Sequence, residues 1–193
     1  LNRNPRNLGV GAHNDLLMQM AQGQMVVLSA GDDIDEPGRV SIVARAFRDG
    51  LGKVCAVAGP LPMIDEQGSP TGNIIRLQVV GAVDADALAE AGCAIGGGAF
   101  ARRLVELFGP IGPEVVTAED IVLAFRAALA GPIVMLDRPV MKYRQHGQSL
   151  LGSSGPLAPD ARRYRQGFER MLRGVIAARR VQLRDIARAE VLD

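Results

Sequence analysis

Residues 25–33 read MVVLSAGDD, an apolar strand that ends in two adjacent carboxylates, Asp32 and Asp33. Open α/β sheets bind ligands where their strands end, and hard carboxylate oxygens suit a divalent cation. A solvated acidic turn before a helix stays open as the alternative, because acidic residues also favour the first turn of a helix. The stretch therefore predicts an α/β fold, with either a ligand site or a helix-capping turn after this strand.

The segments around this strand alternate between helical and extended patterns. Apolar residues at helical spacing predict helices over residues 14–21, 40–47, 85–91, 100–108 and 117–130. Apolar runs predict strands over residues 53–58, 133–136 and 140–143, and the turn-rich stretch 62–72 with the extended segment 73–80 predicts a hairpin or a loop over the site. A Gly/Ser/Pro linker over 151–159 divides a domain over 1–150 from a helical segment over 160–193. We therefore expect a mixed sheet flanked by helices, with a C-terminal helical extension.

Length and composition limit the classes of protein to which this chain can belong. The 193 residues suffice for one domain with a substantial core, and 48% of them are hydrophobic. The formal net charge of +1 and the few aromatic residues do not favour nucleic-acid binding, including that of a template-dependent polymerase. The sequence shows neither a membrane-spanning apolar run nor a signal-peptide pattern. Cys55 and Cys93 lack metal-ligand spacing and predict buried thiols in a reducing compartment, so we expect a cytoplasmic location, extending to the inner face of the membrane.

Three groups of residues follow one another in a specific order. The first is Asn7-Leu8-Gly9 with Asn14 and Gly31-Asp32-Asp33-Ile34, the second runs from Gly97 to Leu107-Phe108-Gly109-Pro110, and the third is Glu119-Asp120-Ile121-Val122-Leu123 with Arg126, running on to Tyr143-Arg144-Gln145-His146. In this order and spacing they resemble the family 2 glycosyltransferases, which are inverting nucleotide-sugar enzymes with the GT-A fold. The resemblance covers about residues 7–149 and implies a GT-A-like, Rossmann-like mixed sheet.

The resemblance implies a donor site around the acidic pair. Asp32 and Asp33 are similar to the residues that hold Mn²⁺ or Mg²⁺ on the diphosphate of a nucleotide-sugar donor, with Asp33 as the expected direct ligand. His146 is expected to bind the metal or a phosphate oxygen, and Asn14 and Arg144 are expected to contact the donor. The residue types agree with this chemistry, because imidazole and carboxylate bind cations and a guanidinium matches oxyanion geometry. Simple solvation of His146 and Arg144 is the alternative.

The resemblance also implies an acceptor site. Asp120 is similar to the catalytic base that takes the proton of the acceptor hydroxyl, a role that typically contributes a factor of about 10² to 10⁴. Glu119, Gly97 and Gly98 are expected to orient the acceptor, which would be a glycan or a lipid-linked molecule. On the residues alone, 117–120 also fits a capping box, and the glycines also fit a tight turn.

The front of the family's domain has no counterpart before Asn7. Two strand–helix units are missing, so we expect these residues to form the C-terminal two-thirds of a catalytic domain and to be inactive as an enzyme on their own. A sheet without its first strands exposes an edge, which predicts association with the missing N-terminal segment or with a second copy as a homo-oligomer. The alternative function is a non-catalytic interaction or assembly fragment of the same fold.

The C-terminal segment 160–193 carries nine arginines against five acidic residues. Its apolar stripe comprises Phe168, Leu172, Val175, Leu183 and Ile186. We expect this helix to pack on the domain or on a second subunit. The alternative is a peripheral membrane helix near a lipid-linked acceptor, although the interspersed acids and many alanines argue against strong membrane binding.

Overall fold

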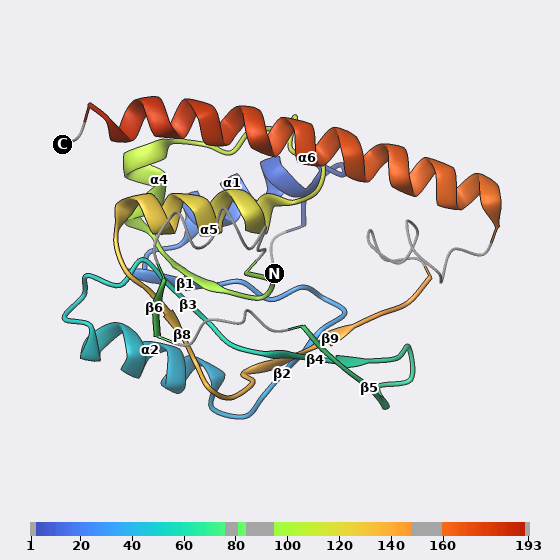
Figure 1. Ribbon diagram of the computed structural model, residues 1–193, viewed down its shortest axis with the longest axis horizontal. Helices are drawn as coiled ribbons and strands as arrows, with labels where there is room; N and C mark the ends of the chain where they lie inside the picture. Colours follow the sequence, from blue (N-terminus) through green and yellow to red (C-terminus); the bar gives the residue numbers. More distant parts are fainter. Residues whose placement is uncertain (1–2, 76–80, 84–94, 148–159, 192–193) are drawn as a thin grey trace.

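The computed structural model describes residues 3–75, 81–83, 95–147 and 160–191 (Figure 1). Its helices are α1 (Val10–Met20), α2 (Arg39–Asp49), α4 (Arg103–Phe108), α5 (Glu119–Ala130) and α6 (Ala161–Ala189). Its strands are β1 (Met25–Val27), β2 (Ile34–Asp35), β3 (Ala56–Ala58), β4 (Leu61–Ile64), β5 (Pro70–Ile75), β6 (Gly81–Val83), β7 (Ala99–Ala101), β8 (Ile133–Met135) and β9 (Met141–Arg144). The predicted α/β class is confirmed, with two mixed sheets flanked by helices and a C-terminal helix.

The strands form two sheets, and the chain passes directly from a strand of the first sheet to a strand of the second at two places. The first sheet has five strands in the order β1-β7-β3-β8-β6, and the second has four in the order β2-β9-β4-β5. Strand β3 pairs in parallel with β8, and β4 pairs in parallel with β9. The chain runs from β3 into β4 and from β8 into β9, so these two stretches lie side by side from one sheet into the other. Strand β2 follows the acidic loop and pairs with β9, which brings that loop to the C-terminal end of β9.

Strand β3 of the first sheet is buried, and its successive side chains point to opposite faces of the sheet. In β3, Val57 packs in a cluster with Val43 of α2, whereas Ala56 lies in the larger core with Leu104 of α4 and Leu123 of α5. The sheet therefore forms a layer between α2 and α5, and α6 lies across α5 on the outside (Figure 1).

Helix α6 packs on the domain, as predicted, but through an unexpected face. Gly174, Ala177 and Ala178 are buried, and a Cβ atom on Gly174 would lie only 2.6 Å from Cγ2 of Thr117. Leu172 and Leu183 of the predicted stripe are exposed instead. Small residues let the backbone of α6 approach α5 and the residue before it closely. The Gly/Ala face of α6, and not the predicted stripe, therefore makes this contact.

Some element boundaries differ from the sequence prediction. Residues 99–101 form strand β7, so the helix predicted over 100–108 begins only at Arg103. Phe100 is extended because β7 pairs on one side with β1 and on the other with β3. The hairpin is confirmed as β4 and β5, and Cys55 is a buried free thiol. The helix predicted over 85–91, Cys93 and the linker over 151–159 lie outside the described residues. Among the helices that the structure describes, none has the length and apolar character needed to cross a membrane.

Candidate functional site

The acidic loop after β1 contacts the end of β9 through backbone and side-chain hydrogen bonds. The backbone N–H of Arg144 donates to Oδ1 of Asp33 at 2.9 Å. Oδ2 of Asp32 lies 3.1 Å from Nε2 of His146. The structure therefore brings together three residues that the sequence placed at the metal site, namely Asp32, Asp33 and His146.

The guanidinium of Arg144 holds the loops around this cluster. Its Nε donates to the carbonyl oxygen of Asp32 at 2.6 Å, and its Nη1 donates to the carbonyl oxygens of Asp65 and Glu66 at 3.0 and 2.8 Å. Asp65 and Glu66 lie in the turn between β4 and β5. Arg144 thus fastens the hairpin turn to the acidic loop, which is a positioning function that the sequence did not reveal.

The donor atoms at this cluster fit a hard divalent cation in type, although they do not converge in advance. Carboxylate oxygen and neutral imidazole nitrogen are both suitable ligands for Mn²⁺. Across the described part of the chain, no three Asp, Glu, His or Cys side chains form a group with metal-binding geometry. Burial raises the pKa of Asp33, and the N–H of Arg144 opposes that rise. A cation here would require Asp33 and the pair Asp32–His146 to close around it.

Arg39 connects the acidic loop to the glycine-rich loop. Its side chain is 2% exposed and forms an ion pair with Asp35. Its Nη2 donates to the carbonyl oxygens of Leu28 and Gly97, both at 2.6 Å. Leu28 follows β1, and Gly97 precedes β7, so one buried cation holds together two loops that are distant in sequence. The sequence does not reveal this function of Arg39, because only the folded chain shows that its side chain is buried.

The glycines at 96–98 make a tight turn beside the acid pair of α5. Gly97 has φ +60°, and a Cβ atom there would lie 1.7 Å from Sδ of Met141. A Cβ atom on Gly98 would press on Ile95 and Phe100 at 2.8 and 2.9 Å. At Gly96 the corresponding position lies 4.0 Å from Oδ2 of Asp120. The turn reading of these glycines is thus supported, and the same turn places backbone next to the Asp120 carboxylate.

Glu119 and Asp120 open α5 without a capping box. The residue before them, Ala118, has φ 67° and ψ 27°, and no side chain caps the helix. Oδ1 of Asp120 accepts a hydrogen bond at 2.9 Å from the N–H of Ile121. A non-glycine residue in the left-handed region is uncommon and costs about 1 kcal/mol or more, and such residues concentrate at functional sites. The local geometry therefore does not support helix capping by Thr117.

The two acidic side chains have altered proton affinity. Burial, followed by the negative charge of Asp120, raises the pKa of Glu119 to about 7. Burial also raises the pKa of Asp120 above its ordinary value, while N–H groups oppose the rise. Two adjacent half-buried carboxyls with raised pKa values are a typical arrangement for proton transfer.

Asn14 is the predicted donor-binding residue that the described contacts do not connect to this region. It is buried on α1, and its Nδ2 donates to the carbonyl oxygen of Val10 at 3.3 Å. Its neighbour Asp15 accepts hydrogen bonds from the N–H groups of Ile111 and Gly112 at 2.7 and 2.9 Å. Helix α1 therefore has a clear structural function in holding the segment before α5.

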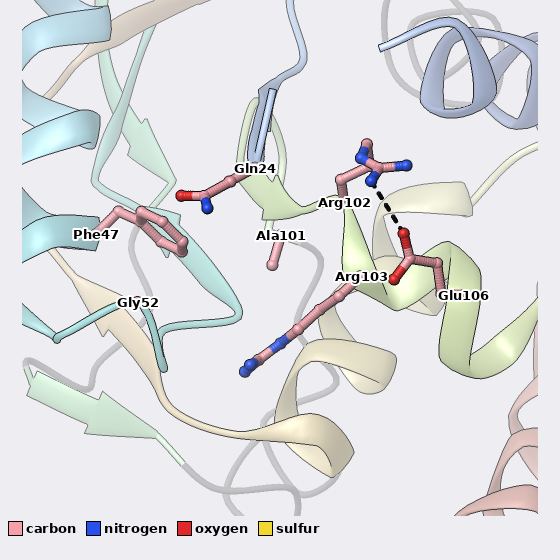
Figure 2. Close-up of a pocket in the computed structure, with 7 residues that line it drawn as sticks. All are labelled: Gln24, Phe47, Gly52, Ala101, Arg102, Arg103 and Glu106. Carbon is pink, nitrogen blue, oxygen red and sulfur yellow. Dashed lines mark ion pairs between the residues drawn. The ribbon is translucent and has the colours of Figure 1, made fainter. Parts of the chain in front are cut away.

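A separate cavity of about 270 Å³ lies at the opposite end of β1 (Figure 2). It is lined by Gln24, Phe47, Gly52, Ala101, Arg102, Arg103 and Glu106. Its charged groups are engaged, because Arg102 pairs with Glu106 at 3.0 Å and Arg103 donates to the carbonyl oxygen of Lys53 at 2.7 Å. None of the predicted site residues lines this cavity, and we assign it no function.

Two solved structures have a similar fold. The crystal structure of S. aureus TarS 1–349 matches with a TM-score of 0.55 and 13% identity, covering 90% of this chain and 52% of that chain. The same TarS segment in complex with UDP gives a TM-score of 0.53 and 13% identity, covering 87% and 51%. No family model and no curated protein matches the sequence. The chain spans about half the length of the TarS structures, and the similarity shows that it has a glycosyltransferase fold.

Proposed function

We propose that this chain is part of a glycosyltransferase of the GT-A type that transfers a sugar from a nucleotide-sugar donor to an acceptor hydroxyl with inversion. The observation that carries the proposal is the link that Arg39 makes between the loop after β1 and the glycine turn, because each of these two segments lies beside a group of acidic residues. One group is Asp32 and Asp33 with His146, and the other is Glu119 and Asp120 beside the glycine turn. The fold shared with TarS, which has been crystallised with UDP, supports the same assignment.

Asp120 is the proposed base of this reaction. Inversion in one step needs a single carboxylate to accept the proton of the attacking hydroxyl, and Asp120 Oδ2 faces the glycine turn while Oδ1 is held by the N–H of Ile121. Its raised pKa strengthens it as a proton acceptor. Glu119, with a pKa of about 7, is largely protonated below that pH and can donate a hydrogen bond to an acceptor oxygen.

Asp33, Asp32 and His146 are the proposed ligands of Mn²⁺ or Mg²⁺. When bound, the cation would neutralise negative charge on the departing nucleoside diphosphate. The chain's own contribution is to hold these side chains in place, because Arg144 fixes the acidic loop to the hairpin turn through three carbonyl oxygens. The acceptor, a glycan or a lipid-linked molecule, would approach Glu119, Gly97 and Gly98.

Calorimetric titration of UDP and of dTDP into the chain with Mn²⁺ tests the donor site. We expect binding by the wild type and by Asp120→Asn, which alters the base, and loss of binding in Asp33→Ala. Asp49→Asn, an exposed change at the end of α2, is the matched control and should bind like the wild type. If the wild type and all of these variants fail to bind UDP and dTDP, the donor site is refuted, and the alternative of a non-catalytic assembly fragment is favoured.

Once nucleotide binding has been measured, the activity of Asp120→Asn tests the role of Asp120 as the base. Hydrolysis or transfer from the donor should fall by about 10² to 10⁴ in Asp120→Asn while nucleotide affinity is unchanged. An equal loss of activity and affinity would instead indicate that Asp120 maintains the site structurally.

A further inference from the structure

Helix α6 carries a second apolar face that the domain does not cover. We call it the α6 stripe, and its members are Tyr164, Phe168, Leu172, Ile176, Leu183 and Ile186, each between 39% and 68% exposed. Their spacing of mostly four or three residues keeps them on one side of the helix. The rings of Tyr164 and Phe168 stack at 6.2 Å, which confirms that the first two members share this side.

The stripe is not needed to hold α6 on the domain. That contact is made by the Gly/Ala face and by the buried ion pair between Arg126 of α5 and Asp185 at 2.8 Å. The N-terminal half of α6 extends beyond the helices beneath it (Figure 1). A soluble domain rarely leaves so many large apolar side chains on one helix face in water, so this face indicates a contact with something else.

The charge beside the stripe is strongly positive. Helix α6 contains nine arginines and two acidic residues, Glu169 and Asp185. Arg162, Arg173 and Arg180 are exposed and make no hydrogen bond or ion pair with the described residues. Asp185 is 0% exposed, so it contributes no negative charge to the surface. Ala177 and Ala178 are buried too, whereas Glu169 is exposed and pairs with Arg165 at 3.1 Å.

We propose that the α6 stripe lies on the surface of a lipid bilayer that contains anionic lipids. A helix with large apolar side chains on one face and arginines beside them is typical of interfacial membrane binding, and arginines near an anionic surface strengthen that binding. The helix is 29 residues long, or about 44 Å, which gives an extended line of contact. Arginine side chains beside the stripe can extend their charged ends to the headgroups while their stems cover apolar surface.

A second copy of the chain fits the stripe less well. Pairing two α6 helices would bring two strongly basic surfaces together, and like charges in close proximity repel. Arg165 and Arg179 fall among the stripe positions, so pairing would also enclose their guanidinium groups. An anionic membrane surface neutralises the same charges.

Co-sedimentation with lipid vesicles tests this proposal. We expect the wild type to bind vesicles of phosphatidylcholine with phosphatidylglycerol at least about tenfold more strongly than vesicles of phosphatidylcholine alone, and to lose most of this preference at high salt. The double change Leu172→Ser and Leu183→Ser should weaken binding at least about tenfold. The matched control, Val40→Ser with Leu51→Ser, removes exposed apolar side chains outside α6 and should bind like the wild type.

A charge variant and a mass measurement complete the test. Arg173→Gln with Arg180→Gln should weaken binding to the anionic vesicles while leaving the weak binding to neutral vesicles unchanged. The proposal is overturned if the wild type ignores anionic vesicles, or if the stripe variant binds them as tightly as the control. It is also overturned if light scattering finds a dimer that the stripe variant disrupts and that does not bind vesicles. These readouts use no nucleotide, so they stand apart from the test of the proposed function.

Discussion

Removing the carboxylate of Asp185 should be one of the most destabilising single changes in the chain. Asp185 is 0% exposed, and its two oxygens accept hydrogen bonds from Nε and Nη2 of Arg126 at 2.8 and 3.3 Å. Arg126 also donates to the carbonyl oxygens of Gly109 and Pro110 at 2.8 and 3.2 Å. The pair therefore joins α5, α6 and the end of α4 at one point.

The magnitude follows from the charge that the change leaves behind. In Asp185→Ala, Arg126 keeps its buried positive charge, and breaking a buried pair in this way typically costs about 3 to 5 kcal/mol. Removing both charges, as in Arg126→Met with Asp185→Leu, leaves carbonyl oxygens without a donor at about 1 to 3 kcal/mol but no unpaired charge. The double variant should therefore be more stable than Asp185→Ala alone.

Urea unfolding followed by circular dichroism measures these differences. The exposed pair between Arg165 and Glu169, at 3.1 Å, supplies the matched control, and Glu169→Ala should change the free energy of unfolding by less than about 0.5 kcal/mol. A loss of less than about 1 kcal/mol in Asp185→Ala would refute the reasoning. The reasoning would also be refuted if the losses of Arg126→Met and Asp185→Leu, each measured alone, added up to the loss of the double variant, because additivity would mean that the two charges do not interact.

Three further changes concern the loops of the candidate site. Ala118→Gly should raise the free energy of unfolding by about 0.5 to 1 kcal/mol, because Ala118 has φ 67°, and a lower melting temperature would contradict this. Gly97→Ala should lower it by about 2 to 4 kcal/mol in urea unfolding, since the methyl group would overlap Met141 at φ +60°; a neutral result would mean that the turn adjusts freely. For Glu119, a pKa raised from 4.5 to about 7 favours the neutral form in the folded state. Its stabilising contribution is therefore complete below about pH 4.5 and disappears as the pH rises through about 7. This pKa shift corresponds to about 3 kcal/mol, which we halve because Glu119 is half-buried. We therefore expect Glu119→Gln to be about 1.5 kcal/mol more stable than wild type at pH 8 and equally stable at pH 4.5. Equal stability at both pH values would be inconsistent with the raised pKa.

Sequence periodicity was sufficient for elements that present one apolar face to the core. Helix α2 and strand β1 were predicted to within a few residues because their apolar side chains have the spacing of the structure they form. Strand β7 was missed because three residues are too few to show a period, and its extended form depends on pairing with β1 and β3. For α6, the sequence pattern predicted that the large apolar residues would pack on the domain. The fold instead buries Gly174 and Ala178, because their small size lets α6 approach the domain closely.

The candidate site was predictable in its carboxylates but not in its supports. Asp32, Asp33, Glu119 and Asp120 could be selected by residue type and by order along the chain. The functions of Arg39 and Arg144 depend on carbonyl oxygens of segments remote in sequence, and no local pattern encodes such contacts. Asn14 was selected because its position matches the family's motif, but its side chain donates a hydrogen bond within its own helix, to the carbonyl oxygen of Val10.

The arginines near the site share one property that bears on its electrostatics. Arg39 and Arg144 donate mainly to backbone carbonyl oxygens, and within the described chain neither forms an ion pair with Asp33 or Asp120. Had these guanidinium groups paired with the carboxylates, the pKa values of the acids would be lowered, and their charge would be neutralised internally. The pKa of each of these two acids is instead raised, chiefly by burial. Arg39 and Arg144 thus hold the loops without an ion pair to Asp33 or Asp120, so these two carboxylates keep the capacity to bind an external cation or an external proton that the proposed reaction requires.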